Sequence, residues 1–115
     1  MVISIKDNKI NCVVVHSPEK IRQGMMGKTF DGFEGMLFIM PQDEMQSFWM
    51  KNCIIPLDII FISDNEIEDI SPNCPPCESE ECESYQGKGG MVLELPGGYC
   101  RKNNIKIGDT VDFEF

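Results

Sequence analysis

The sequence predicts a mainly β fold, a β-rich α+β domain that forms a small barrel or sandwich with two short helices. Three observations lead to this class. The length of 115 residues suits one domain. A content of 42% hydrophobic and 25% charged residues is typical of globular proteins. Short apolar runs, separated by glycine and proline, outnumber the helix signals. No repeat or linker divides the chain, so residues 1–115 are expected to form a single domain.

The first elements follow from β-branched residues and a helix-start signal. Ile10–Val15 is a β-branched apolar run and is therefore a predicted strand. Ser17 can cap a helix, and Pro18 suits its first position because its backbone nitrogen needs no partner there. Gly27 can end that helix in a left-handed turn.

Three apolar runs in the middle of the chain predict three strands. They are Met36–Met40, Ser47–Asn52 and Leu57–Ser63. Pro41 and Pro56 separate them, and proline interrupts the hydrogen bonding of a central strand. Leu57–Ser63 is apolar on both faces, so this strand should be central and buried.

The second half of the chain predicts three more strands and a second helix. Glu66–Ser71 alternates weakly, whereas Met91–Leu95 is a clear strand, with Gly87–Gly90 as the turn before it. A short helix is expected around Gly98–Asn103. Thr110–Phe115 alternates polar and apolar residues as a final strand.

The charge is concentrated in one segment. The formal net charge is -9, and residues 64–83 hold eight of the 19 acidic residues but none of the ten basic ones. We expect this acidic, cysteine-containing segment to be a solvated loop on a nearly neutral body. Non-specific nucleic-acid binding and anionic membrane surfaces need a basic face, so neither partner is expected.

Cys74, Cys77 and Cys82 within this segment allow three interpretations. The first is a Cys77–Cys82 disulfide, contributing about 2 kcal/mol, or idle thiols. The second is a zinc site with all three as ligands, although a fourth is not evident. The third, a redox pair of Cys74 and Cys77, is disfavoured because Pro75-Pro76 extends the chain and the acids raise thiol pKa values. No cofactor is expected, with zinc as the alternative.

Two carboxylates stand in predicted buried strands. Asp58 lies within Leu57–Ser63 and Glu94 within Met91–Leu95. Each is costly to bury unless it is paired or hydrogen-bonded. Arg22 and Lys51 are the cations available to neutralise them. The favoured interpretation is a structural cluster of ion pairs and hydrogen bonds that fixes strand register.

A pocket is the alternative interpretation of the same residues. Trp49 would form its floor, and the neighbouring polar side chains would hold a polar ligand. The candidate binding residues are Arg22, Trp49, Lys51, Asn52, Asp58 and Glu94. Asp58 and Glu94 could act as an acid–base pair if their environments split their pKa values. Ligand binding is preferred to catalysis, and no catalytic residue is assigned.

Several motifs together resemble one family. They are Arg22–Lys28, Gly35–Phe38, Phe48–Asn52, Pro56–Ile62, Pro76-Cys77, Tyr85, Val92–Leu95 and Gly108-Asp109. Their order resembles the uncharacterised family called domain of unknown function 192, found in bacteria, archaea and some phages. The resemblance runs from about Ile10 to the end of the chain. It implies a compact, β-rich, barrel-like domain and supplies neither an activity nor catalytic residues.

These observations predict a non-enzymatic binding or interaction domain for a small polar ligand or a protein. The alternatives are a zinc protein using Cys74, Cys77 and Cys82, and a carboxylate-based enzyme. The longest apolar run, Met36–Met40, is too short to span a bilayer. The N-terminus lacks a basic start followed by an apolar stretch. A cytoplasmic location is therefore expected, with export as the alternative. The oligomeric state is not predicted.

Overall fold

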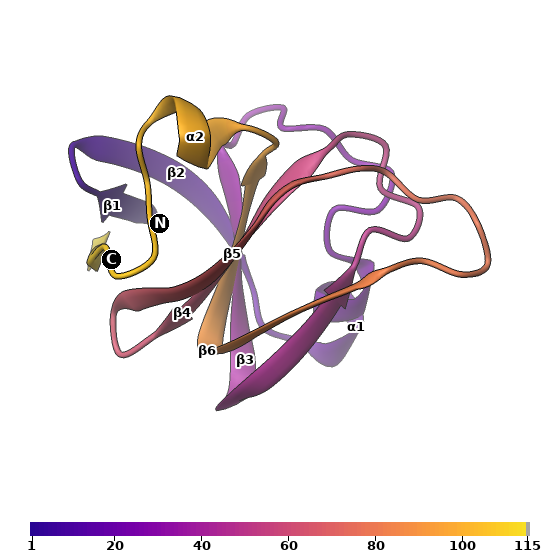
Figure 1. Ribbon diagram of the computed structural model, residues 1–115, viewed down its shortest axis with the longest axis horizontal. Helices are drawn as coiled ribbons and strands as arrows, with labels where there is room; N and C mark the ends of the chain where they lie inside the picture. The colour runs from indigo at the N-terminus through magenta and orange to yellow at the C-terminus, as the bar shows by residue number, and fades with distance from the viewer. Residues whose placement is uncertain (115) are drawn as a thin grey trace.

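The computed structural model describes residues 1–114. Seven strands form one curled sheet, and two short helices lie at well-separated places on it (Figure 1). The elements in chain order are β1 (Val2–Ile5), β2 (Asn8–Val15), α1 (Pro18–Gln23), β3 (Gly35–Trp49), β4 (Leu57–Ser63), β5 (Glu66–Cys74), β6 (Ser84–Pro96), α2 (Tyr99–Lys102) and β7 (Val111–Glu114). The predicted fold class, mainly β with two short helices, is confirmed. None of the helices in residues 1–114 has the length and apolar character needed to cross a membrane.

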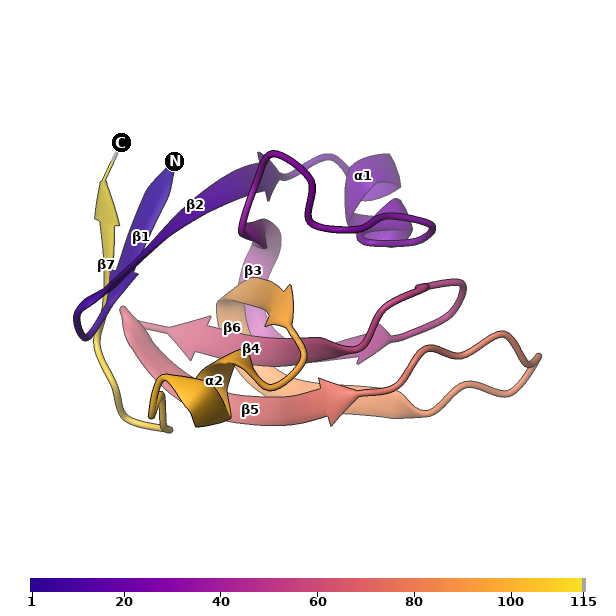
Figure 2. The same cartoon turned by 90° about the horizontal axis from the view of Figure 1, so that it is seen from above.

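The strand order is β5-β4-β6-β3-β2-β1-β7, and β2 and β3 form its parallel pair. The remaining neighbours are antiparallel. A bridge between Glu66 and Thr110 and a hydrogen bond from the Val111 N–H to the Asn65 carbonyl (2.8 Å) join the two ends of this order. The sheet is therefore curled into a half-barrel, in which the first strand, β1, pairs with the last, β7 (Figure 2).

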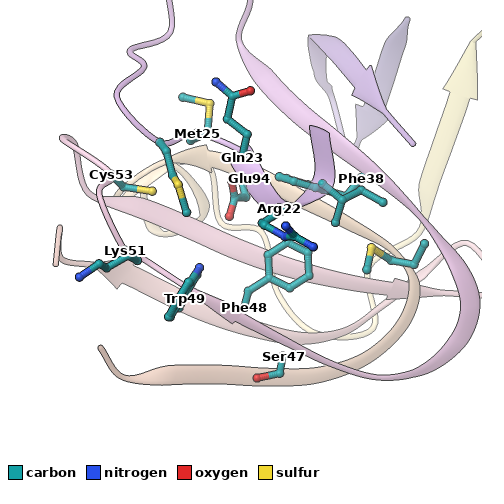
Figure 3. A pocket seen from close by; sticks show the side chains of 14 residues that line it. Arg22, Gln23, Met25, Phe38, Ser47, Phe48, Trp49, Lys51, Cys53 and Glu94 are labelled. Atoms are coloured by element: carbon teal, nitrogen blue, oxygen red, sulfur yellow. The ribbon is translucent and has the colours of Figure 1, made fainter. Parts of the chain in front are cut away.

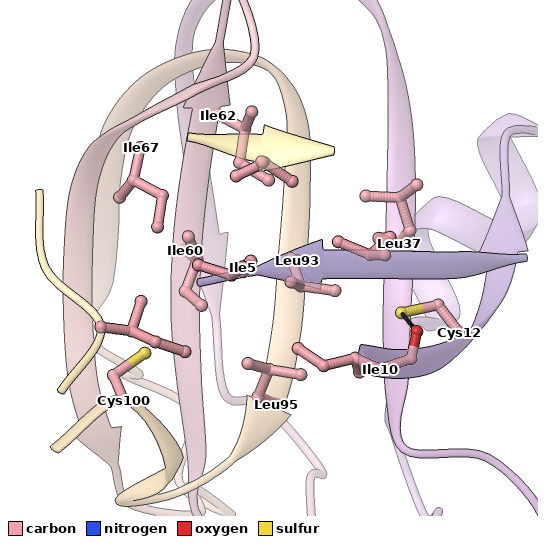
Figure 4. Packing of buried hydrophobic residues seen from close by; sticks show 13 residues of the cluster. Ile5, Ile10, Cys12, Leu37, Ile60, Ile62, Ile67, Leu93, Leu95 and Cys100 are labelled. Carbon is pink, nitrogen blue, oxygen red and sulfur yellow. Dashed lines mark hydrogen bonds between the residues drawn. The ribbon is translucent and has the colours of Figure 1, made fainter. Parts of the chain in front are cut away.

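The sheet buries side chains on both faces. One cluster takes residues from all seven strands, which lie around the whole curl, so it fills the interior of the half-barrel. Ile5, Ile60 and Leu93 of this cluster are fully buried (Figure 4). A second cluster, with Phe38, Phe61 and Val92, lies on the outer face. All seven residues of β4 are buried, as predicted for a central strand.

Strand β3 replaces two of the predicted strands. The chain runs through Pro41 without leaving the sheet, and the pairing of β3 with β6 shifts register between Ile39 and Glu44. An irregularity of this kind accommodates a residue without a backbone N–H. The bend lets both halves of β3 contribute to one region of the outer face.

Gly87–Gly90 is part of β6 and not the predicted turn. A Cβ atom on Gly87 would lie 2.3 Å from the Phe61 ring, and one on Gly89 would lie 2.6 Å from the Ile62 carbonyl oxygen. Glycine is needed here because β4 packs closely against β6, not because the chain turns.

Three other expectations need correction. Helix α1 ends earlier than predicted, at Gly24, which has a φ of 48° and donates its N–H to the Lys20 carbonyl oxygen. Strand β1 was not predicted, because it has only four residues and depends on pairing with β2 and β7. The acidic segment 64–83 is not wholly a loop, since β5 occupies it as far as Cys74.

Candidate functional site

The candidate site is identified by the side chain of Glu94. Glu94 lies in β6 on the outer face of the sheet, in register with Met36 of β3 and Ile59 of β4. Its side chain is only 3% exposed. Among residues 1–114 no hydrogen bond or ion pair reaches its carboxyl group, whose oxygens face a cavity instead of packed protein. The residue is buried, but its carboxyl oxygens are accessible from the cavity, because no enclosed side-chain oxygen in residues 1–114 lacks a partner. A carboxyl group that finds no protein partner requires a physical account.

Helix α1 and the chain after it cover this part of the outer face. Ser17 Oγ accepts a hydrogen bond from the Lys20 N–H (3.3 Å) and Pro18 occupies the first helical position, as the sequence predicted. Beyond Gly24, Met25 is 1% exposed and packs in the outer cluster.

The cavity beside Glu94 has a volume of about 150 Å³. Its lining comes from α1 and the chain after it, from both halves of β3, from the segment before β4 and from β6 (Figure 3). The residues that line it are Ile21, Arg22, Gln23, Gly24, Met25, Met26, Phe38, Met40, Ser47, Phe48, Trp49, Lys51, Cys53 and Glu94. We call this cavity the Glu94 pocket.

The inner part of the Glu94 pocket is apolar apart from Glu94 itself. Met25, Phe38 and Cys53 are each 5% exposed or less. Phe38 and Phe48 meet edge to face, with ring centroids 5.1 Å apart, and this contact fixes the wall between the two halves of β3. Trp49 is 49% exposed, so it stands at the mouth and not at the floor, where it was expected.

The environment changes the acidity of two groups in the pocket. Burial raises the pKa of the Glu94 carboxyl to about 8, so near neutral pH it is largely protonated. Burial, with a smaller contribution from the Glu94 charge, raises the pKa of the Cys53 thiol to about 11. Cys53 therefore stays protonated and is a poor nucleophile.

Arg22 and Lys51 line the pocket, but neither forms the expected ion pair with Glu94 or Asp58. Lys51 Nζ donates instead to the Ser79 carbonyl oxygen (2.6 Å), and Arg22 is exposed. Within residues 1–114 the ion pairs are Lys6–Asp109 and Lys88–Asp43, both remote from the pocket lining. The expected ion pairs are therefore wrong, whereas the expected hydrogen bonds are found at Asp58.

Asp58 lies outside the pocket, on the interior face of the sheet. Its carboxylate accepts three backbone hydrogen bonds, from the N–H groups of Asn73 (2.7 Å), Gly98 (2.9 Å) and Cys100 (2.8 Å). These bonds attach the start of α2 and the end of β5 to β4. Asp58 and Glu94 project from opposite faces, so the expected acid–base pair of the two carboxylates does not exist.

Asn52 also has a backbone role. It adopts a left-handed conformation with a φ of 60°. Its N–H donates to the Cys77 carbonyl oxygen (2.8 Å), and its own carbonyl oxygen accepts from the Gly27 N–H (2.9 Å). Asn52 therefore holds the segment that carries Lys51 and Cys53 between the end of the α1 region and the cysteine loop, although its side chain does not line the pocket.

The cysteine loop supports this segment. Cys77 and Cys82 form a disulfide, and the Cys77 N–H donates to the Met50 carbonyl oxygen (3.2 Å). Cys74 is buried, with its thiol against the Ser71 carbonyl oxygen, so it cannot join Cys77 and Cys82 around one ion. No group of three His, Cys, Asp or Glu side chains in residues 1–114 is arranged to hold a metal, so the zinc interpretation gains no support.

The structure brings Arg22, Trp49, Lys51 and Glu94 to one cavity, whose apolar half was not predicted from the sequence. Met25, Phe38 and Cys53 read as ordinary core residues. Their type gives no signal of a cavity, because only the bend of β3 and the position of α1 bring them around Glu94.

Comparison with known proteins gives a family without an assigned activity. The model of family DUF192, described as "Uncharacterized ACR", matches residues 1–113, which confirms the resemblance seen in the sequence. No curated protein matches the chain.

Two solved structures share the fold. A protein of unknown function from Novosphingobium aromaticivorans is 30% identical, with a TM-score of 0.86 over 97% of this chain and 84% of that one. A Sinorhizobium meliloti protein described as a "putative transcription regulator" is 26% identical, with a TM-score of 0.85 over 96% of this chain and 91% of that one.

Proposed function

The chain belongs to the DUF192 family, and we propose that it is a non-enzymatic domain that binds a small, largely apolar molecule in the Glu94 pocket. The observation that carries this proposal is the unpartnered Glu94 carboxyl in the apolar inner part of the cavity. A bound molecule would supply the hydrogen-bond partner that the protein does not.

The size and lining of the pocket support this function. Ligand sites in proteins are mostly apolar, with a few polar groups that fix the orientation of the ligand. An apolar cavity of about 150 Å³ can accommodate a molecule the size of benzene. The Glu94 pocket has this volume, together with one buried polar group and an open mouth at Trp49.

Binding is favoured over catalysis by the chemistry of the groups in the pocket. A nucleophile needs an adjacent base to activate it. The candidate nucleophile, Cys53, has a pKa raised to about 11, and no histidine lines the cavity. The remaining candidate acid or base, Glu94, has no second titratable group in hydrogen-bond contact with it in the described chain.

The description of the Sinorhizobium meliloti relative as a regulator does not extend the proposal to DNA. The net charge of this chain is -9, and binding to nucleic acid requires a basic face that displaces counterions. The proposal therefore assigns the chain a small-molecule ligand and no nucleic-acid contact.

A matched pair of substitutions on β3 tests the proposal. Met40 lines the pocket, whereas Met45 on the same strand is 64% exposed and lies outside it. A panel of single-ring compounds is screened by ligand-observed NMR against the unmodified chain, Met40→Trp and Met45→Trp. We expect binding to the unmodified chain and to Met45→Trp, and its loss in Met40→Trp, because the indole fills the cavity. Equal binding to both variants would place the ligand elsewhere and contradict the proposal.

A further inference from the structure

We propose that the Glu94 pocket is selective for an organic cation, a primary or methylated ammonium group attached to a small apolar body. This inference rests on the proposed function and names its ligand class. The feature that carries it is a nine-tenths buried carboxyl group that faces a cavity walled by aromatic rings and thioethers and forms no ion pair with a cation among residues 1–114 (Figure 3).

An ammonium group is the partner that would relieve the cost of burying Glu94. The charged form of an isolated carboxyl group is strongly disfavoured away from water. An ammonium ion within hydrogen-bond distance would favour the charged form and create a charge-assisted hydrogen bond. Such bonds contribute more than those between neutral groups, particularly where water is excluded.

The walls of the pocket also suit a cation. Trp49 and Phe48 border the cavity, and the faces of aromatic rings attract ammonium groups within about 6 Å. Met25, Met26 and Met40 contribute polarisable thioethers, which adapt to apolar bodies of irregular shape. This combination of one acid with aromatic and thioether walls resembles the lining that ammonium ligands require.

Arg22 and Lys51 are the charges that oppose this inference, but Arg22 is exposed and the ammonium group of half-buried Lys51 bonds at the surface, which limits their effect. Lys51 Nζ is occupied by the Ser79 carbonyl oxygen, and Arg22 lies in solvent on α1. Exposed charges are screened by water and salt, whereas the interaction of a ligand with buried Glu94 is not. The other titratable groups that sense Glu94 are the Cys53 and Cys74 thiols, and burial keeps both protonated.

A ligand that only accepts hydrogen bonds is the competing possibility, and pH separates the two. Protonated Glu94 can donate to a carbonyl or carboxylate group, so an acceptor would bind best below pH 8. A cation binds the ionised form, so its affinity would rise as the pH increases toward 8, by up to about tenfold per pH unit. At pH 7 a cation would displace about one proton from the carboxyl group.

Benzylamine, benzyl alcohol and benzoate provide the test, because they share one ring and differ in charge. Isothermal titration calorimetry at pH 7, in two buffers of different ionisation enthalpy, gives the affinity and the number of protons released. We expect benzylamine to bind at least about tenfold more tightly than the other two and to release about one proton. Glu94→Gln should remove both effects. Glu68→Gln, on the exposed surface of β5, should change neither.

The outcomes separate this inference from the proposed function. If all three compounds bind equally and Met40→Trp blocks them, the pocket binds ligands but the preference for cations is wrong. If benzoate or benzyl alcohol binds most tightly, or Glu94→Gln leaves benzylamine binding unchanged, the inference is also overturned. If none of the compounds binds the unmodified chain better than Met40→Trp, both the inference and the proposed function fail.

Discussion

Asp58 and Glu94 are buried carboxyl groups on adjacent strands of one sheet, but they differ in their hydrogen-bond partners. Asp58 faces the interior of the half-barrel, is fully buried and accepts three backbone hydrogen bonds. Glu94, one register position away, faces outward into a cavity and has no partner in residues 1–114. Burial alone therefore does not identify a functional carboxylate. The difference lies in whether the protein itself satisfies the group.

The largest expected effect on stability comes from removing Asp58, the carboxylate that has protein partners. Asp58→Ala leaves three backbone N–H groups near the core without their acceptor, so the free energy of unfolding should fall by about 3–5 kcal/mol. Asp58→Asn keeps one acceptor oxygen and should lose less. Urea denaturation measures both. A loss below about 1 kcal/mol for Asp58→Ala would mean that these hydrogen bonds do not hold α2 in place.

Glu94→Gln should behave differently, with an effect that depends on pH. The folded-state pKa of about 8 is above the ordinary value, so the folded chain holds a proton that the unfolded chain has lost. Stability from this group is fully present below pH 4 and declines as the pH rises to about 8. Relative to the unmodified chain, Glu94→Gln should gain on the order of 4 kcal/mol between pH 4 and pH 9.

Denaturant unfolding of both proteins across this pH range measures the difference. Glu68→Gln is the control, because an exposed carboxyl group should show no comparable gain. A stability difference between Glu94→Gln and the unmodified chain that stays constant with pH would show that Glu94 is satisfied after all.

Removing the disulfide tests whether the cysteine loop supports the segment 50–53, which carries Lys51 and Cys53 of the Glu94 pocket. Cys77→Ser with Cys82→Ser opens a loop of six residues, so the free energy of unfolding should fall by about 2 kcal/mol. Because Cys77 bonds to Met50 and Asn52, amide NMR signals should shift at residues 50–53 and not around Asp58. Reduction of the unmodified chain should reproduce the change and leave the double variant unaltered. Equal shifts around Asp58 would contradict this local coupling.

Lys51→Met should have the smallest effect. Its ammonium group is at the mouth and bonds to one carbonyl oxygen, so stability should change by less than about 0.5 kcal/mol. Loss of a repelling charge should strengthen benzylamine binding about twofold. Lys9→Met, at an exposed position of β2 outside the pocket, should leave the affinity unchanged. Weaker binding of benzylamine to Lys51→Met would contradict the repulsion between Lys51 and a cationic ligand.

The sequence predicted those features that depend on local chemistry. The helix start at Ser17 and Pro18 depends only on neighbouring residues. The apolar run around Ile60 likewise indicates a buried strand from its own composition. Features set by distant contacts were missed. Gly87 is explained only by the Phe61 ring beside it, and Pro41 only by the bend of β3.

The candidate site shows the same limit. Glu94 and Asp58 look alike in the sequence, because each is an acid within an apolar strand. Which face each one occupies depends on the register, and which one finds partners depends on where α1 and α2 pack. The sequence could therefore identify both carboxylates, but not which of them lacks a partner.

The most direct test is a ¹³C NMR titration of the Glu94 carboxyl group, assigned by its loss in Glu94→Gln, with and without benzylamine. The account predicts a midpoint of about 8 in the free protein and a lower midpoint when benzylamine is bound. A midpoint near the ordinary value for glutamate, about 4.3, unaffected by benzylamine, would contradict it.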